Sequence, residues 1–342
     1  MEIKMHDIVV IGSSAGGVNA LKELLSSFPG DLVASVFIVQ HVAADHASHL
    51  PQILSAAGKL KAVHPRDGDP ILPGYAYIAP PDYHMILEKD RILVKKGPKE
   101  NHFRPSIDVM MRSAAYWYGS RVIGVVLTGL LNDGTSGMWS VKYFGGTCLV
   151  QSPSDAQYPD MPRYVLENME VDYAVPLSEM GAKIAALTHQ PVASLPDVNE
   201  AIRQRLKLEI DAAAQQNAFE EGIMKIGEKS GLTCPECGGA MVLINEGNTI
   251  RYRCHTGHGF SSASLFLGIT ESIEANLWRA VRSIEEGIML FEQLAGQSEK
   301  SGNAEQTKLY DDQSAELRKR ASALLAFIYD KGQIADMNNS GT

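Results

Sequence analysis

Residues 7–187 alternate between short apolar runs and amphipathic segments, and this alternation restricts the possible folds more than any other feature of the sequence. Helical patterns lie around 17–28, 46–57, 106–118, 134–144 and 161–169. Between them stand four runs that are almost continuously apolar and rich in β-branched residues: DIVVIG, VASVFIVQ, RVIGVVLTG and GTCLVQ. Parallel strands that are buried on both faces have this composition. The sequence therefore predicts an α/β domain with a doubly wound, mostly parallel sheet.

The segment YAYIAPPDYHMILEKDRILVKKG interrupts the alternation, and we expect it to form a hairpin with KD at its tip. The character of the chain changes after the first domain, which we place at 1–190. The prediction for the rest is a helical linker, a cysteine-rich module, a helical region and a disordered tail, at 191–231, 232–260, 261–332 and 333–342.

Apolar residues near a 3.6-residue period mark the helical region. One stripe consists of Leu277, Val281, Ile284, Ile288 and Phe291. We expect this stripe to pack against a second helix of the same chain, which we favour over a seam between two copies. The sequence does not indicate an oligomeric state.

Composition excludes several classes of partner. A formal net charge of −9 over 342 residues argues against nucleic acid. Apolar runs stay shorter than the roughly 18 residues of a membrane span, so we expect no membrane insertion. The start MEIKMHD lacks the apolar centre of a signal peptide, and we therefore expect a cytoplasmic protein.

The first predicted strand runs into the turn GSSAGG, which fits two kinds of site. A dinucleotide fingerprint would extend from Gly12 to Gly17, but Ser14 replaces its middle glycine. The acidic residue expected about 20 positions later is also misplaced, because Asp31 lies in a loop before the second strand. The pattern G-x-S-x-G fits at every position, and it presents a serine nucleophile at a sharp strand-to-helix turn.

Three polar residues follow three predicted strands directly, and together they suit nucleophilic catalysis. Ser14 is the candidate nucleophile, His41 its base and Asp133 the acid that orients the base. Carboxyl ends of parallel strands meet at one edge of a sheet, so we expect these side chains to converge. Taken singly, each has an ordinary explanation: a helix cap for Ser14 or Asp133, and a backbone-bonded histidine for His41.

The chain resembles the catalytic domain of the CheB-type protein-glutamate methylesterases over residues 6–188. Six blocks carry the resemblance in order: IGSSAGG, VQHV, DGDPILPGYAYIAPPDYHM, HFRPSIDVMMRSAA, VVLTGLLNDGTSGM and MPRYVLENM. That family hydrolyses γ-glutamyl methyl esters on chemotaxis receptors and deamidates certain receptor glutamines. The resemblance implies the same activity here, on a methylated chemoreceptor or another protein, with no cofactor for catalysis.

Position by position, the resemblance places the family's triad on Ser14, His41 and Asp133. It implies an oxyanion donor at the backbone N–H of Leu130. Around this site we expect Gly16 and Gly17 to leave room for substrate and backbone donors, and Arg104 and Arg163 to bind acidic groups of the substrate. For both arginines, structural salt bridges are the alternative.

The chain also departs from the family pattern. Ala15 follows the nucleophile where threonine is common, and Leu130 and Leu131 replace Met and Gly in the acid loop. The first strand begins at residue 7, so we expect no receiver domain to switch the enzyme. The alternatives are a related esterase that acts outside chemotaxis and a non-catalytic signalling scaffold.

The cysteine-rich module reads CPECGGAMVLINEGNTIRYRCHTGHGF. Cys234 and Cys237 form a C-x-x-C knuckle, and the alternating segment after them predicts a hairpin that brings Cys254 and His258 back to it. This ligand set suits a closed structural zinc site. His255 is the alternative fourth ligand, and we favour His258 because neighbouring side chains usually diverge. A redox pair is a further alternative, which lacks a βαβ setting here.

Two expectations follow for the other cysteine and for the role of the metal. Cys148, inside the run GTCLVQ, should be a buried core residue. Because protein ligands fill all four positions, we expect zinc to stabilise the module and small-ester hydrolysis to survive its loss.

Overall fold

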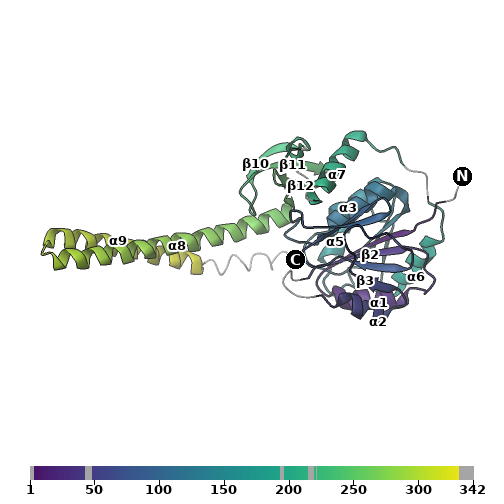
Figure 1. Cartoon of the computed structure of the whole chain (residues 1–342), viewed down its shortest axis with the longest axis horizontal. Helices are drawn as coiled ribbons and strands as arrows, with labels where there is room; N and C mark the ends of the chain where they lie inside the picture. Colours follow the sequence, from purple (N-terminus) through teal and green to yellow (C-terminus); the bar gives the residue numbers. More distant parts are fainter. Residues whose placement is uncertain (1–3, 43–47, 193–195, 215–218, 221, 331–342) are drawn as a thin grey trace. The chain divides into compact units, whose positions relative to one another are not determined.

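A computed structural model describes residues 4–42, 48–192, 196–214, 219–220 and 222–330. Its central sheet has seven parallel strands in the order β3-β4-β2-β1-β7-β8-β9. Figure 1 shows this sheet between two layers of helices. The four apolar runs form the middle of this sheet, which confirms the predicted fold class. The strand bounds are β1 Ile8–Ser13, β2 Ser35–Gln40, β3 Lys61–Val63, β4 Tyr75–Ile78, β7 Val122–Val126, β8 Thr147–Gln151 and β9 Tyr173–Val175.

Helices cover both faces of the sheet and give it two apolar cores. One face carries α1 (Gly17–Ser27), α2 (Leu50–Ala57) and α6 (Leu177–Thr188). The other carries α3 (Ile107–Tyr118), α4 (Thr135–Tyr143) and α5 (Asp160–Asn168), and the short 3-10 helix η1 (Gly119–Arg121) follows α3. Each of α1 to α5 overlaps a predicted helix, although residues 46 and 47 of the second prediction lie outside the described part. Cys148 is fully buried, as expected.

The predicted hairpin is correct in its second half and wrong in its first. Strands β5 (His84–Glu88) and β6 (Arg91–Lys95) are antiparallel, with Lys89 and Asp90 at the tip. Tyr75–Ile78 instead forms β4, which pairs in parallel with β2 and β3. The reason is burial: Ala76, Tyr77 and Ile78 are all buried inside the sheet, and a solvent-facing hairpin would have exposed one side of the strand.

The described residues between 196 and 266 belong to the same compact unit as the α/β domain. Within the predicted linker, α7 (Glu200–Ala213) packs against α3 and buries Leu206 in the core. The short helix η2 (Ile223–Lys225) follows.

Residues 228–266, which we call the cysteine module, contain a four-stranded antiparallel sheet and the first turn of a long helix. The strands are β10 (Glu228–Thr233), β11 (Ala240–Glu246), β12 (Thr249–Cys254) and β13 (Gly259–Ser261). Strands β11 and β12 form the hairpin predicted from the alternating segment.

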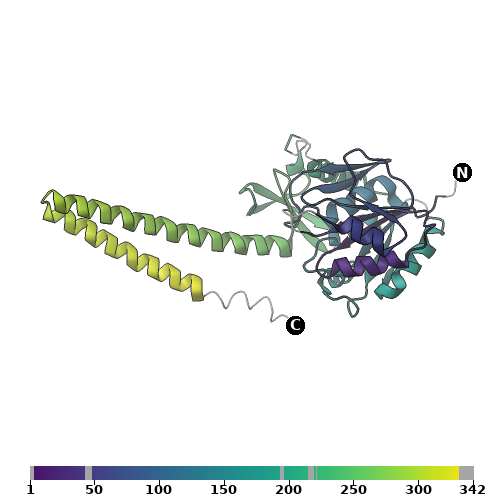
Figure 2. The ribbon, with the colours of Figure 1, turned by 60° about the horizontal axis from the view of Figure 1, so that its bottom comes forward.

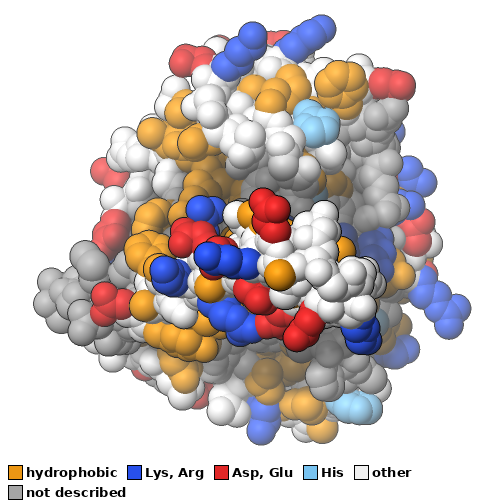
Figure 3. All heavy atoms as spheres, turned by 90° about the vertical axis from the view of Figure 1, so that its left-hand side faces the viewer, with side chains coloured by type: hydrophobic (Ala, Val, Ile, Leu, Met, Phe, Trp, Pro, Cys, Tyr) orange, Lys and Arg blue, Asp and Glu red, His pale blue; other side chains and the backbone are white. Residues whose placement is uncertain are grey.

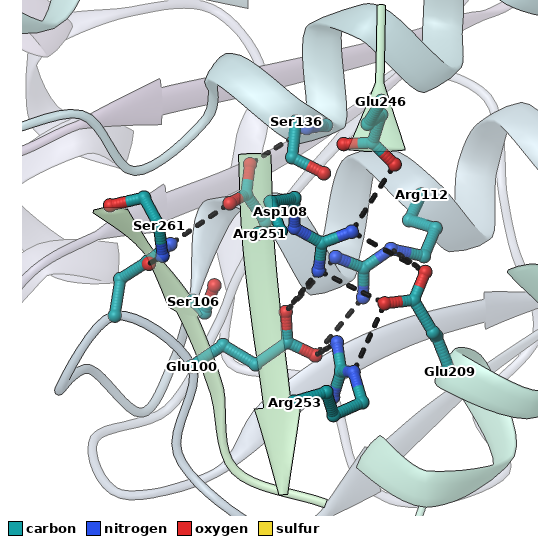
Figure 4. A network of polar contacts seen from close by, with 12 residues as sticks. Glu100, Ser106, Asp108, Arg112, Ser136, Glu209, Glu246, Arg251, Arg253 and Ser261 are labelled. Atoms are coloured by element: carbon teal, nitrogen blue, oxygen red, sulfur yellow. Dashed lines mark hydrogen bonds and ion pairs between the residues drawn. The ribbon is translucent and has the colours of Figure 1, made fainter. Parts of the chain in front are cut away.

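Buried ion pairs connect the cysteine module to the α/β domain (Figure 4). Glu100, in the loop between β6 and α3, receives two hydrogen bonds from Arg112 of α3, both 3.0 Å, and one of 2.7 Å from Arg253 of β12. Glu209 of α7 binds Nε of the same Arg253 at 3.0 Å and Nη2 of Arg251 at 3.1 Å. All five side chains are at most 5% exposed. We call this set the ionic cluster.

The second compact unit begins at Leu267, and its described residues form two long helices. Helices α8 (Ser262–Lys300) and α9 (Ala304–Asp330) run antiparallel, side by side in Figures 1 and 2. Rings of Phe291 and Tyr310 stack 6.1 Å apart, and those of Trp278 and Tyr329 meet edge to face at 6.2 Å. Val281 and Ile288 of the predicted stripe are buried, which fits packing within the chain. The predicted disordered tail lies outside the described residues.

The surface shown in Figure 3 and the helices of the described residues carry no large single-charge face and no membrane-spanning segment. On the face shown in Figure 3, acidic, basic and apolar side chains are intermingled rather than segregated by charge. In the described part of the chain, no helix combines the length and the apolar character that crossing a membrane requires.

Candidate active site

The three predicted catalytic residues meet at the carboxyl edge of the sheet. Ser14 follows β1, His41 follows β2, and Asp133 lies in the loop between β7 and α4. Strand β1 is the topological switch point, because the chain proceeds outward from it through β2 and then returns to its other side with β7. Ligands in doubly wound sheets bind at this position.

Ser14 is held in a sharp turn between β1 and α1. Its N–H donates to Thr128 O at 3.0 Å, and its carbonyl accepts the N–H of Gly17 at 2.9 Å. Gly16 has φ 74°, a left-handed conformation in which glycine carries no steric penalty. A Cβ at Gly16 would also lie 2.8 Å from Oε1 of Gln157. The glycine pattern thus serves the turn that presents the serine.

His41 bridges the other two residues. Its Nδ1 lies 3.2 Å from Ser14 Oγ, and its Nε2 lies 2.8 Å from Asp133 Oδ2. The His41 side chain is 4% exposed, and the ring of Phe103 stacks on it with centroids 3.7 Å apart and an interplanar angle of 8°. Stacking by Phe103 therefore fixes the plane of the imidazole, and the contacts of its two nitrogens fix its rotation within that plane.

Asp133 accepts hydrogen bonds from several donors besides His41. Its Oδ2 accepts the N–H of Ile107 at 2.7 Å, and its Oδ1 accepts Asn101 Nδ2 and Ser106 Oγ, both at 3.0 Å. Ile107 opens α3, so the carboxylate lies at a helix N-terminus. Burial opposes ionisation of Asp133, but hydrogen bonding to His41 and then to these donors outweighs it and lowers the pKa.

The ionised Asp133 determines which nitrogen of His41 carries the proton. A carboxylate can only accept, so Nε2 is protonated and Nδ1 presents its lone pair to Ser14 Oγ. That is the tautomer in which an imidazole can remove the hydroxyl proton. The arrangement can therefore perform nucleophilic acyl transfer.

A second buried carboxyl, Asp108, lies beside Asp133 and caps α4. Its Oδ1 accepts the N–H groups of Gly134 and Gly137 at 2.9 and 2.7 Å. Burial and then the negative charge of Asp133 raise the pKa of Asp108 well above its ordinary value. The pKa values of the two neighbouring carboxyls thus shift in opposite directions, and Asp133 remains the charged one.

The residues predicted around the triad have different local roles. The Gly17 N–H is bonded to Ser14 O, and a Cβ at Gly17 would lie 2.1 Å from Gln40 Oε1, so this glycine makes room for protein rather than substrate. Leu130 is 47% exposed on the acid loop. Leu131 has φ 64°, which a leucine rarely adopts and which glycine, the residue of the family pattern, adopts freely.

The two predicted substrate arginines differ in their surroundings. Arg104 donates to Asp82 Oδ1 at 2.6 Å and to Gly97 O at 2.7 Å, as the structural alternative predicts. Arg163 is 53% exposed on α5, 4.0 Å from Asp160. Met161 of the same helix donates its N–H to Gly129 O at 3.0 Å, which places α5 next to the Ser14 turn. Arg163 is therefore the more available cation.

Sequence reasoning missed two amides that organise the site. Gln40 accepts Ser13 Oγ at 2.7 Å and donates to the carbonyls of Ser14 and His41 at 2.8 and 2.9 Å, so it joins the ends of β1 and β2. Asn101 binds the acid of the triad. Gln40 precedes His41 in the block VQHV, which was a usable signal, whereas Asn101 precedes the block HFRPSID and has no motif of its own.

The four predicted metal ligands lie together in the cysteine module. Ligand atoms of Cys234, Cys237, Cys254 and His258 are all within 4.8 Å of one another. His255 instead packs its ring edge to face with Phe219, centroids 6.2 Å apart. Three thiols and one imidazole match the preference of zinc, and their separations allow one ion to contact all four. The residues present therefore fit a closed zinc site.

Comparisons with known proteins identify the family of the α/β domain. Residues 9–184, just over half of the chain, match the family described as CheB methylesterase. A relative from Leptospira interrogans is 37% identical over 176 residues, which cover 51% of this chain and 91% of that protein. The protein-glutamate methylesterase/protein-glutamine glutaminase 2 of Methanosarcina mazei is 35% identical over 191 residues, 54% of this chain and 52% of that protein.

Among solved structures, the Thermotoga maritima CheB methylesterase catalytic domain aligns with a TM-score of 0.52 and 34% identity. The alignment covers 53% of this chain and 98% of that domain. The matched region contains the strand ends that carry Ser14, His41 and Asp133. The chain belongs to the CheB methylesterase family.

Proposed function

We propose that this protein is a serine hydrolase that removes methyl groups from γ-glutamyl methyl esters of chemoreceptor-type proteins, and that it also deamidates glutamine. The single observation that carries the proposal is the hydrogen-bonded chain from Ser14 Oγ through His41 to Asp133. The names of relatives such as the Methanosarcina mazei protein support the substrate class.

The residues assign each proton of the reaction. His41 Nδ1 takes the proton of Ser14 Oγ as the oxygen attacks the ester carbonyl, and Asp133 stabilises the imidazolium. His41 then returns the proton to the departing methoxide, which leaves as methanol, and the glutamyl group remains esterified to Ser14. Water, deprotonated by His41, attacks this acyl-enzyme and releases the glutamate carboxylate with Ser14 restored. With a glutamine substrate, ammonia leaves in place of methanol.

Methanol release from purified methylated chemoreceptors tests the substrate class. We expect a much higher kcat/KM for the receptor ester than for a small aryl acetate, because binding outside the reacting group accelerates the preferred substrate. Turnover of the aryl acetate without release of methanol from receptors would favour the esterase that acts outside chemotaxis. Failure of a fluorophosphonate probe to label Ser14 would favour the non-catalytic scaffold.

We also propose that Cys234, Cys237, Cys254 and His258 hold one structural zinc ion. The donor set and the 4.8 Å limit on their separations support this proposal. Because the four protein ligands would complete a tetrahedral site, the zinc would supply folding energy rather than activate water. Metal analysis of the purified chain should find about one zinc per chain, and Cys237→Ser should abolish it.

A further inference from the structure

Residues 100–103, between β6 and α3, contact the catalytic triad and the cysteine module at the same time. Their backbone pairs with the start of β13: the Asn101 N–H donates to Gly259 O at 2.8 Å, and the Gly259 N–H donates to Lys99 O at 3.2 Å. Gly259 follows His258, one of the four candidate zinc ligands. We call residues 100–103 the bridging loop.

Asn101 is the central contact of the bridging loop. Its Nδ2 donates to Asp133 Oδ1 at 3.0 Å and to Asp108 Oδ2 at 2.9 Å. Its Oδ1 accepts the N–H of Ser261 at 2.9 Å and Oγ of Ser264 at 2.8 Å. The amide cannot rotate without breaking both sets, because hydrogen-bond donors face its oxygen and carboxyl oxygens face its nitrogen. The cysteine module therefore fixes the position of Asn101, which donates a hydrogen bond directly to Asp133, the acid of the triad.

The next two residues repeat this double contact. Phe103 stacks on the His41 ring, at a centroid distance of 3.7 Å. His102 points the other way, with Nε2 2.7 Å from Ser264 O and Nδ1 3.4 Å from Oε1 of Glu236. Glu236 lies between Cys234 and Cys237 in the zinc knuckle. The bridging loop thus contacts the cysteine module beside Cys234 and Cys237 and beside His258, the two segments that carry the candidate zinc ligands.

The backbone of the bridging loop depends on these contacts. Asn101 has φ 51° and His102 has φ 70°, both in the left-handed region. Asparagine and histidine occur in this region more often than most residues, but it remains uncommon for any residue except glycine, and two such residues in succession persist where surrounding contacts impose them. Removal of the module contacts should therefore let the loop relax to other backbone angles.

The ionic cluster offers a competing account. Glu100 is anchored by Arg112 and Arg253 without any metal, and on this account the ionic cluster alone fixes the loop. However, Arg253 also donates to Gly257 O at 2.8 Å, and it precedes Cys254 directly. The segment that carries Arg253 is thus continuous with the candidate zinc ligands Cys254 and His258. If the ionic cluster alone fixes the bridging loop, removal of metal leaves the loop unchanged; if the module fixes it, removal of metal loosens it.

We propose that the cysteine module, when it holds its metal, positions the catalytic triad through the bridging loop, with Asn101 as the positioning residue. The proposal rests on the triad assigned above. It reverses the expectation that small-ester hydrolysis survives the loss of zinc, because Asp133 and His41 would each lose a neighbour that fixes them.

A pair of serine variants in the full-length chain tests the contact with Asn101. Ser264→Ala removes the hydroxyl that donates to Asn101 Oδ1, while Ser262→Ala removes an exposed hydroxyl that donates to Ile250 O at 3.2 Å. We expect Ser264→Ala to lower kcat for a small aryl ester by about two- to tenfold with little change in KM, since one hydrogen bond is lost behind the triad. Its bridging-loop amides should also exchange faster with deuterium. Ser262→Ala should match the wild type in both measurements.

Zinc removal from the wild type tests the coupling without substitution. We expect a chelator to accelerate amide exchange in residues 99–104 and to lower kcat, and added zinc to restore both. Cys237→Ser should resemble the chelated protein and should not respond to the chelator. Should chelated wild type keep its exchange protection and kcat, or should the two serine variants behave alike, the proposal is wrong. Amide exchange reports on the loop even if the protein has no methylesterase activity, so the two proposals can fail separately.

Discussion

At the scale of single residues, the charge of Asp133 governs the site. Several donors converge on this buried carboxylate, and the helix N-terminus of α3 adds to them. Because the carboxylate stays ionised, it holds the proton of His41 on Nε2 and leaves Nδ1 free to act on Ser14. The same set of hydrogen bonds makes the site sensitive to Asn101, which supplies one of the donors from outside the strand ends.

Leu131 gives a prediction about stability. Its φ of 64° favours glycine and penalises β-branched residues most. We expect Leu131→Val to destabilise the protein by about 1–2 kcal/mol and Leu131→Gly to be neutral or slightly stabilising. Urea unfolding of the full-length variants measures both. Equal destabilisation by the two substitutions would show that side-chain packing, rather than the backbone angle, determines the effect.

Arg163 gives a prediction about substrate binding. As an exposed cation on the helix beside the Ser14 turn, it should attract acidic groups near a receptor glutamyl ester. Arg163→Gln should raise KM for methylated receptor about two- to fivefold at low salt, and the difference should shrink at high salt. Lys22→Gln, the same charge change at an exposed position of α1, serves as the control. A KM unchanged at every salt concentration would assign Arg163 to the surface pair with Asp160.

The sequence predicted the triad because strand ends in a parallel sheet meet at one edge. It could not predict Asn101, because that residue reaches Asp133 from a loop that is hydrogen-bonded to the cysteine module, far away in sequence. Nor could it separate Arg104 from Arg163, since the partner of Arg104, Asp82, lies 22 positions away in sequence. Local patterns indicate what a residue can do, and distant contacts decide whether it is available.

At the scale of elements, the ionic cluster fastens β12 and α7 to α3. Burial opposes ionisation of Glu209, but the charges of Arg251 and then Arg112 outweigh it and hold its pKa well below the ordinary value. The same is true of Glu100 beside Arg112 and Arg253. A depressed carboxyl pKa stabilises the folded state above the ordinary value near 4.5, and this stabilisation is lost as pH falls through the folded pKa.

Glu209→Gln should therefore destabilise the protein in a pH-dependent way. At pH 7 we expect a loss of about 3–5 kcal/mol, because the buried arginines lose a counter-charge. The difference in free energy of unfolding between variant and wild type should become smaller below about pH 4.5, where the wild type begins to lose the stabilisation that its ionised Glu209 provides. Urea unfolding at several pH values measures it, with Glu88→Gln in the partly exposed pair with Arg91 as the control. A difference that stays constant down to pH 3 would contradict the role of charge.

Prediction of elements from the sequence succeeded for strands that are apolar along their whole length. It failed for segments whose burial depends on partners distant in the sequence. The four central strands are apolar throughout, so periodicity identified them. Tyr75–Ile78 reads like one side of a hairpin, because two tyrosines alternate with Ala76 and Ile78. The charged helix α7 looked like a linker, because its cluster residue Glu209 is neutralised by arginines more than 40 positions later.

At the scale of the whole molecule, the family match ends near residue 184, while the first compact unit continues to Phe266. The additional part contributes Arg251, Arg253 and Glu209 to buried contacts and Ser261 and Ser264 to the environment of the triad. The part of the first compact unit that lies outside the family match is therefore a structural component of the catalytic unit.

Mass spectrometry of methylated chemoreceptors tests the central claim most directly. Receptors are incubated with the full-length wild type, with Ser14→Ala, or without enzyme, and the methylated glutamyl peptides are quantified. We expect the wild type to convert the methyl esters to glutamates and Ser14→Ala to leave them at the level of the sample without enzyme, because the nucleophile is missing. Equal demethylation by the wild type and Ser14→Ala, or none by a zinc-loaded wild type, would contradict the proposed function.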